Sequence, residues 1–145
     1  MRVQYALAAV ALIALQGSAL ADCLQEKVII SKATVKTEDW GKSIAFAVTN
    51  NLKWPISFVS IKYEVVSKGR AVPWDATVFG MDIQGGIEPG ETRTVRTTLS
   101  LPSDVPEELE ARGAIVDVAD ASRRQLIGKP RYAGNSKELS PLACE

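Results

Sequence analysis

The chain has 145 residues, with 17 basic and 17 acidic side chains, no histidine and two cysteines. This length is typical of a single domain. The balanced charge, without any run of lysine or arginine, argues against nucleic acid or an anionic membrane as partner, since both bind clustered positive charge. The lack of histidine removes the commonest general base and the commonest metal ligand.

The first 21 residues have the pattern of an export signal. Arg2 precedes an apolar run from Ala6 to Leu15, and Ala19-Leu20-Ala21 offers the small-x-small pattern of a cleavage site. We therefore expect a periplasmic or secreted protein that begins at Asp22 and keeps no membrane span. Two alternatives stay open, a retained membrane anchor and a lipid on Cys23. An anchor needs about 18 apolar residues, more than the run from Ala6 to Leu15 provides. A lipid site needs a small neutral residue where Asp22 stands.

The two cysteines, Cys23 and Cys144, lie at the two extremes of the mature chain. In an exported protein a single pair normally oxidises, so we predict an intramolecular disulfide. The closed loop would span nearly the whole domain, for which the chain-entropy model gives at most about 4 to 5 kcal/mol. A redox or metal role would require neighbouring thiols, as in C-x-x-C.

Alternation of apolar and polar residues predicts β-strands in the first half of the mature chain. We expect a first strand over Lys27–Val35, a turn over Lys36–Ser43 with Gly41 at a positive φ, and strands over 43–50 and 57–66. One face of each of the last two is apolar, which is the pattern of a sheet that is buried on one side.

The second half continues in the same way. Ser67–Arg70 predicts a hairpin turn, and Pro73 makes the following strand, 71–79, an edge strand because proline lacks a ladder donor. A strand over 92–101 and a connection over 102–111 follow. Residues 113–120 and 122–128 predict a last hairpin, and 129–144 a surface tail.

Seven to eight strands with turns every 8 to 12 residues or so predict an all-β, immunoglobulin-like antiparallel sandwich over residues 22–145, with an open barrel as the alternative. The residues expected to supply its core are Ile44, Phe46, Val48, Val59, Ile61, Tyr63, Val95, Leu99 and Val116.

The stretch GGIEPGET, Gly85 to Thr92, matches the phosphate-loop pattern except that Glu91 stands where lysine belongs. A phosphate loop also needs a helix directly after it, to direct backbone N–H groups at the anion. Here a predicted strand follows. We therefore expect a turn at Pro89-Gly90 and no bound nucleotide.

The run from Val48 to Arg70, followed by Gly85 to Pro102, resembles the FxLYD and LEA14-like family of small bacterial immunoglobulin- or fibronectin-like domains. The matching features are an Asn-rich turn at Asn50-Asn51, an aromatic-bearing strand at 59–63, a hairpin glycine at Gly69 and the turn at 87–92. The pattern departs from the family where Tyr63 is not followed by aspartate. The resemblance implies the fold and brings no catalytic residues or cofactor.

Catalysis would have to use the loop carboxylates Asp75, Asp82 and Glu88, beside Trp74, because serine and threonine have no histidine to activate them. Acids of this kind in loops are usually solvated. No calcium-loop spacing occurs either. We therefore predict that the protein is not an enzyme and holds no metal or other cofactor.

The tryptophans Trp40, Trp54 and Trp74 fall in predicted turns or an edge strand. Exposed indoles are enriched at protein and sugar contacts, so these three are candidate partner contacts, with packing at the sandwich ends as the alternative. The favoured hypothesis is an exported, non-catalytic binding or assembly module of the bacterial cell envelope, whose partner is an envelope protein or glycan. A small carbohydrate-binding domain or hydrolase is the alternative.

Overall fold

The computed structural model describes residues 24–31, 33–123 and 126. The export signal, Cys23, Cys144 and the tail from residue 129 onwards lie outside the described residues, so their interpretations stay predictions. None of the described helical residues forms a segment long and apolar enough to cross a membrane.

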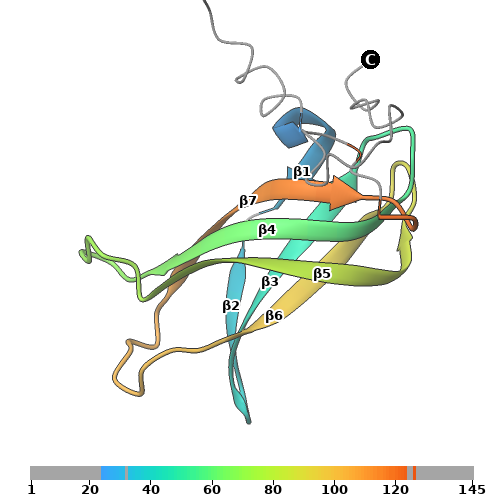
Figure 1. The fold of residues 1–145 in the computed structure, drawn as a ribbon. Coiled ribbons are helices and arrows are strands. Elements are labelled where there is room, and N and C mark those ends of the chain that lie inside the picture. Colours follow the sequence, from blue (N-terminus) through green and yellow to red (C-terminus); the bar gives the residue numbers. More distant parts are fainter. Residues whose placement is uncertain (1–23, 32, 124–125, 127–145) are drawn as a thin grey trace, which may run out of the picture.

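The described chain forms two antiparallel sheets packed face to face, an immunoglobulin-like β-sandwich of seven strands (Figure 1). One sheet contains four strands in which β3 pairs with β1, β2 and β6, and the other has the order β5-β4-β7. A single helical turn at 24–27 precedes β1. The strands are β1 (Val28–Ile30), β2 (Thr34–Glu38), β3 (Gly41–Asn50), β4 (Ile56–Val66), β5 (Asp75–Ile87), β6 (Thr92–Leu99) and β7 (Glu110–Ala119).

The single strand expected over Lys27–Val35 is wrong, because it is divided into β1 and β2. Both pair with β3, but between them Ala33 forms an isolated bridge to Ala111 of β7, in the opposite sheet. The chain thus leaves one sheet, contacts the other and returns. The expected turn over Lys36–Ser43 is also too long, since 36–38 pair with 41–43 and leave a two-residue hairpin turn.

Eight of the nine predicted core residues are buried between the sheets. The exception is Val116, whose side chain is 42% exposed. Ser60 pairs with Asp117 whereas Ile61 pairs with Ile115, so Val116 is the extra residue of a β-bulge. The bulge interrupts the alternation, and β7 instead buries Ile115 and Val118.

Antiparallel pairing gathers the connections at the two ends of the sandwich (Figure 1). At one end lie the β3–β4 loop (51–55), the β5–β6 turn (88–91) and the turn after β7 (120–123). The opposite end carries the β2–β3 turn, the β4–β5 loop and the β6–β7 connection. Pro73 lies in the β4–β5 loop before β5 begins at Asp75, so the expected start of that strand at Ala71 is wrong. β5 is nonetheless an edge strand.

Candidate functional site

The end of the sandwich that carries the β3–β4 loop contains a surface hollow of about 610 Å³. Its walls come from the start of β4 (Ser57), the second half of β5 (Asp82 to Gly86), the following turn (Glu88) and the turn after β7 (Ala121). Segments that are far apart in the sequence thus meet at one place. Loops at one end of a rigid sandwich are a common position for binding sites in this architecture.

The hollow owes its shape to an irregularity in β5. Ile56 pairs with Ile87 and Phe58 with Asp82, so the four residues 83–86 lie opposite the single residue Ser57 and leave the ladder. Gly85 and Gly86 have φ values of 79° and 69°, which favour glycine. A side chain on Gly86 would place its Cβ 3.1 Å from the carbonyl oxygen of Ile56. The two glycines therefore allow the bulged segment to lie close against β4.

Asn50, at the end of β3, connects the loops around the hollow. Its side chain is fully buried, and its Nδ2 donates hydrogen bonds of 2.8 Å to the carbonyl oxygens of both Trp54 and Ile87. Its Oδ1 accepts a 2.9 Å bond from the backbone N–H of Leu52. One side chain thus bonds to three backbone groups of the β3–β4 loop and the end of β5, which are buried or partly buried. From the sequence, Asn50 is expected only as the last residue of a strand and as part of an Asn-rich turn.

The GGIEPGET stretch is a strand end followed by a turn, as predicted. The N–H of Glu91 bonds to the Glu88 carbonyl at 2.9 Å, Gly90 has φ 83°, and β6 begins at Thr92. The Glu91 carboxylate accepts a bond from the Glu88 N–H and another from Arg93 at 2.7 Å. These contacts, that of the Glu88 N–H first, lower the pKa of Glu91. An acid thus stabilises the turn at the position where a phosphate loop carries lysine.

We expect calorimetric titration with ATP or GTP and magnesium to give no heat of binding. The turn continues into a strand, so no helix N-terminus is present to direct N–H groups at a phosphate. Saturable binding that disappears when Gly90 is replaced would contradict this prediction.

The structure separates two of the three candidate carboxylates. Asp75 and Asp82 lie seven residues apart on β5, about 23 Å at the usual rise per residue. Asp75 accepts a 2.9 Å hydrogen bond from the Tyr63 hydroxyl, and Asp82 pairs with Arg123 at 2.6 Å. Only Asp82 and Glu88 line the hollow. Trp74 is adjacent to Asp75, at the other end of β5.

Burial, and after it the hydrogen bond and charge of Asp75, raise the pKa of Tyr63 to about 12. Because the folded state holds the phenol proton more tightly than the unfolded chain, Tyr63 stabilises the fold fully below pH 10. This contribution is lost as the pH rises from 10 to 12. We expect a loss on the order of 1 to 3 kcal/mol, since one pKa unit corresponds to about 1.36 kcal/mol. Urea unfolding at pH 9 and 12 measures it. A Tyr63→Phe variant with an equal loss would contradict the assignment.

The three tryptophans do not form one surface. Trp40, in the β2–β3 turn, is 63% exposed. Trp74 is half-buried, donates from Nε1 to the Ser67 hydroxyl at 3.0 Å, and is covered by the guanidinium of Arg70 at 3.6 Å from the ring centre. Trp54, at the opposite end, packs against the core. Packing thus accounts for Trp54 and Trp74, and Trp40 alone keeps a largely exposed indole.

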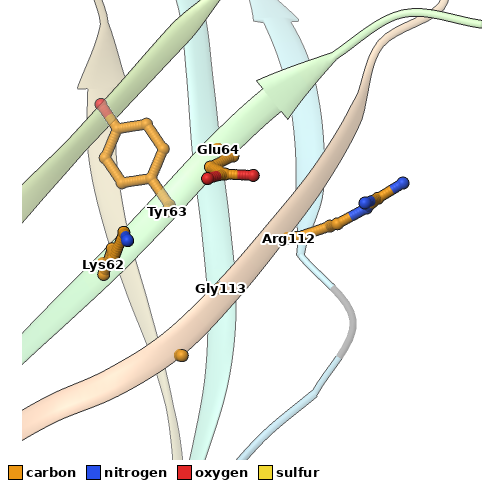
Figure 2. A pocket seen from close by; sticks show the side chains of 6 residues that line it. Lys62, Tyr63, Glu64, Arg112 and Gly113 are labelled. Atoms are coloured by element: carbon orange, nitrogen blue, oxygen red, sulfur yellow. The ribbon is translucent and has the colours of Figure 1, made fainter. Parts of the chain in front are cut away.

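A smaller hollow of about 240 Å³ lies on the β4 and β7 strands (Figure 2). Lys62 and Glu64 of β4 and Arg112 of β7 line it, and Figure 2 shows Arg112 extending from β7 away from β4. Gly113 lies beside Tyr63 in the ladder, and a Cβ at this position would overlap the buried ring of Phe46. The lining carries charges of both signs and belongs to the sheet surface, not to the loop end.

No family model matches the chain, and no curated protein or solved structure is found to be similar to it. The resemblance to FxLYD and LEA14-like domains therefore stays a prediction. Among the described residues, no three acidic or cysteine side chains gather in a way that would hold a metal ion.

Proposed function

We propose that the chain is an exported, non-catalytic binding or assembly module of the cell envelope, and that it binds an envelope protein or glycan through the loop end of the sandwich. The observation that supports this function is the 610 Å³ hollow, which is lined by residues from three loops. The buried Asn50 side chain holds two of these segments together through its bonds to the carbonyls of Trp54 and Ile87. The export signal, the absence of histidine and the resemblance to FxLYD-type domains support it independently.

The loop end suits recognition because its geometry is held before a partner arrives. The β3–β4 loop and the β5–β6 turn are joined by the Asn50 side chain and by two backbone bonds, from Asn50 to Glu91 and from Gly90 to Asn50. A preorganised site loses less conformational entropy on binding than loops that must be ordered. The lining mixes backbone groups, a hydroxyl and carboxylates, which are suitable hydrogen-bonding groups for either a polypeptide or a sugar.

Affinity capture from an envelope extract tests the proposal with variants at the two ends of the sandwich. Ala121→Trp places a large side chain at the exposed rim of the hollow and is expected to abolish capture of the partner. Trp40→Ala, at the opposite end, removes the most exposed indole and is expected to leave capture unchanged. The reverse pattern, or equal capture by both variants, would overturn the assignment to the hollow.

Asp82 and Glu88 favour one alternative, a carbohydrate-binding domain or hydrolase, because both line the same hollow. Most glycosidases use a pair of carboxyl groups as their catalytic residues. Incubation with envelope glycans distinguishes the two functions. We expect no cleavage product, whereas hydrolysis that is lost in both Asp82→Asn and Glu88→Gln would replace the non-catalytic proposal by the enzymatic one.

A further inference from the structure

The two open sheets have four edges, and an unprotected edge offers unpaired backbone groups to other chains. In the described part of the chain, three edges are protected. The edge formed by β1 and β2 consists of short strands with a break between them, and β6 carries two arginines. The β7 edge is contacted at three points, through Ala33, through Gln25 on the Ile115 carbonyl at 2.7 Å, and through the Leu126 N–H on the Val118 carbonyl at 2.9 Å.

The fourth edge, that of β5, has none of these features between Asp75 and Asp82. Figure 1 shows β5 as the outer strand of its sheet, and within the described residues it pairs only with β4. The six residues of Ala76–Met81 contain no charge and no proline. The bulge begins only after Asp82. An uncharged segment of this length, without a bulge, is the type of edge that pairs with another strand.

The pairing pattern shows which backbone groups of β5 face outward. Ile115 directs its carbonyl away from β4, so its neighbour Ala114 directs its own groups toward Lys62. The backbone N–H and C=O of Lys62 therefore point toward β7 and away from Val78, its partner on β5. The backbone N–H and C=O of Val78 accordingly point toward the open edge of the sheet. By the same alternation, the residues of this segment whose N–H and C=O point outward are Ala76, Val78 and Gly80.

Ala76 and Gly80 are small residues, and the side chain of Val78 is partly exposed to solvent. The Val78 side chain is 49% exposed. At Gly80 the ring of Phe58 occupies the space that a side chain would need, since the Phe58 Cζ lies 2.7 Å from the position of a Cβ. No bulky side chain therefore obstructs a strand that approaches this edge.

We propose that β5 pairs with β5 of a second copy of the chain, antiparallel about a twofold axis at Val78, so that two three-stranded sheets become one of six strands. In this register Val78 lies opposite Val78 and Ala76 opposite Gly80, and every outward N–H and C=O of the three residues finds a partner. The apolar pair at the axis adds cross-strand contact. This inference does not depend on the proposed function.

The charges favour this register over its neighbour. With Val78 on the axis, Asp75 lies opposite the uncharged Met81. A shift of one residue would place Asp75 opposite Asp82, and each outward-facing residue would then lie opposite a residue whose N–H and C=O face β4. The segment is thus complementary to itself, which is what a twofold interface requires.

Light scattering coupled to size-exclusion chromatography of the mature protein tests the proposal. The wild type is expected to have the mass of two chains, and Val78→Lys that of one chain, because two ammonium groups would face each other at the axis. Val116→Lys is the matched control, since Val116 is similarly exposed but lies on β7. It should remain a dimer. A monomeric wild type, or a dimer that survives Val78→Lys, would overturn the proposal.

A charge-reversal experiment separates loss of the interface from misfolding. Val78→Lys and Val78→Asp are each expected to be monomeric alone and to form a dimer when mixed in equal amounts, since the opposite charges then meet at the axis. Circular dichroism of each variant reports on its fold. A mixture that stays monomeric, or a wild-type mass that corresponds to a complex with a different protein bound at β5, would contradict the self-pairing.

Discussion

Replacement of Asn50 by alanine is expected to lower the free energy of unfolding by about 3 kcal/mol or more. The side chain is fully buried and bonds to the carbonyls of Trp54 and Ile87 and to the N–H of Leu52. Alanine leaves these three backbone groups without a partner, and a buried unsatisfied group costs about 1 to 3 kcal/mol. Urea unfolding followed by tryptophan fluorescence measures the change.

Two further variants separate the hydrogen bonds from other effects. Asn51→Ala changes the neighbouring but exposed asparagine and is expected to alter stability by less than about 0.5 kcal/mol. Asn50→Asp keeps the volume and the acceptor for Leu52, but places an oxygen instead of an amide group against two carbonyls. It should destabilise the protein at neutral pH much as alanine does. A loss below about 1 kcal/mol in Asn50→Ala would show that other groups replace its bonds.

The sequence predicted the central strands well because one of their faces is buried and the other is not. In β3 and β4, residues two apart share a face, so apolar side chains at every second position mark the inward side. Ile44, Phe46 and Val48 in β3 and Val59 and Ile61 in β4 are all buried as expected. Where burial follows a strict period of two, local pattern and tertiary structure carry the same information.

The strand interruptions could not be predicted, because contacts between distant segments determine them. The break between β1 and β2 depends on the bridge from Ala33 to Ala111, 78 positions later. The bulge at Val116 and the bulged segment 83–86 both depend on how β4 pairs with its two neighbours. Nothing in VDVAD or DIQGGI distinguishes a bulged strand from a regular one, apart from two adjacent glycines that are compatible with a turn.

The candidate site was the least predictable part, because it consists of positions and not of a motif. Residue type alone indicated the acids and tryptophans, whereas the structure places Asp75 and Trp74 at one end of β5 and Asp82 near the other. Asn50 looks like any turn asparagine until its burial is known. A polar residue at the end of an alternating apolar face, where the next buried position is expected, is the one local signal that could have indicated its role.

Ile61→Ala is expected to lower the free energy of unfolding by about 2 to 5 kcal/mol, as is usual when a fully buried isoleucine is truncated. Ile61 lies on the central strand of its sheet, paired with Phe79 on one side and Ile115 on the other, so neighbours on both sides limit collapse of the cavity. Val116→Ala removes apolar atoms from the exposed bulge and should cost less than about 1 kcal/mol.

The comparison of these two variants tests the bulge as well as the core. A regular β7 without the extra residue would shift the alternation of that strand and bury Val116, as the sequence alone suggested. Val116→Ala would then cost about as much as a core substitution. Chemical denaturation of both variants under the same conditions gives the two values. A loss below about 0.5 kcal/mol for Ile61→Ala would mean that β4 presents its opposite face to the core, with Lys62 and Ser60 directed inward.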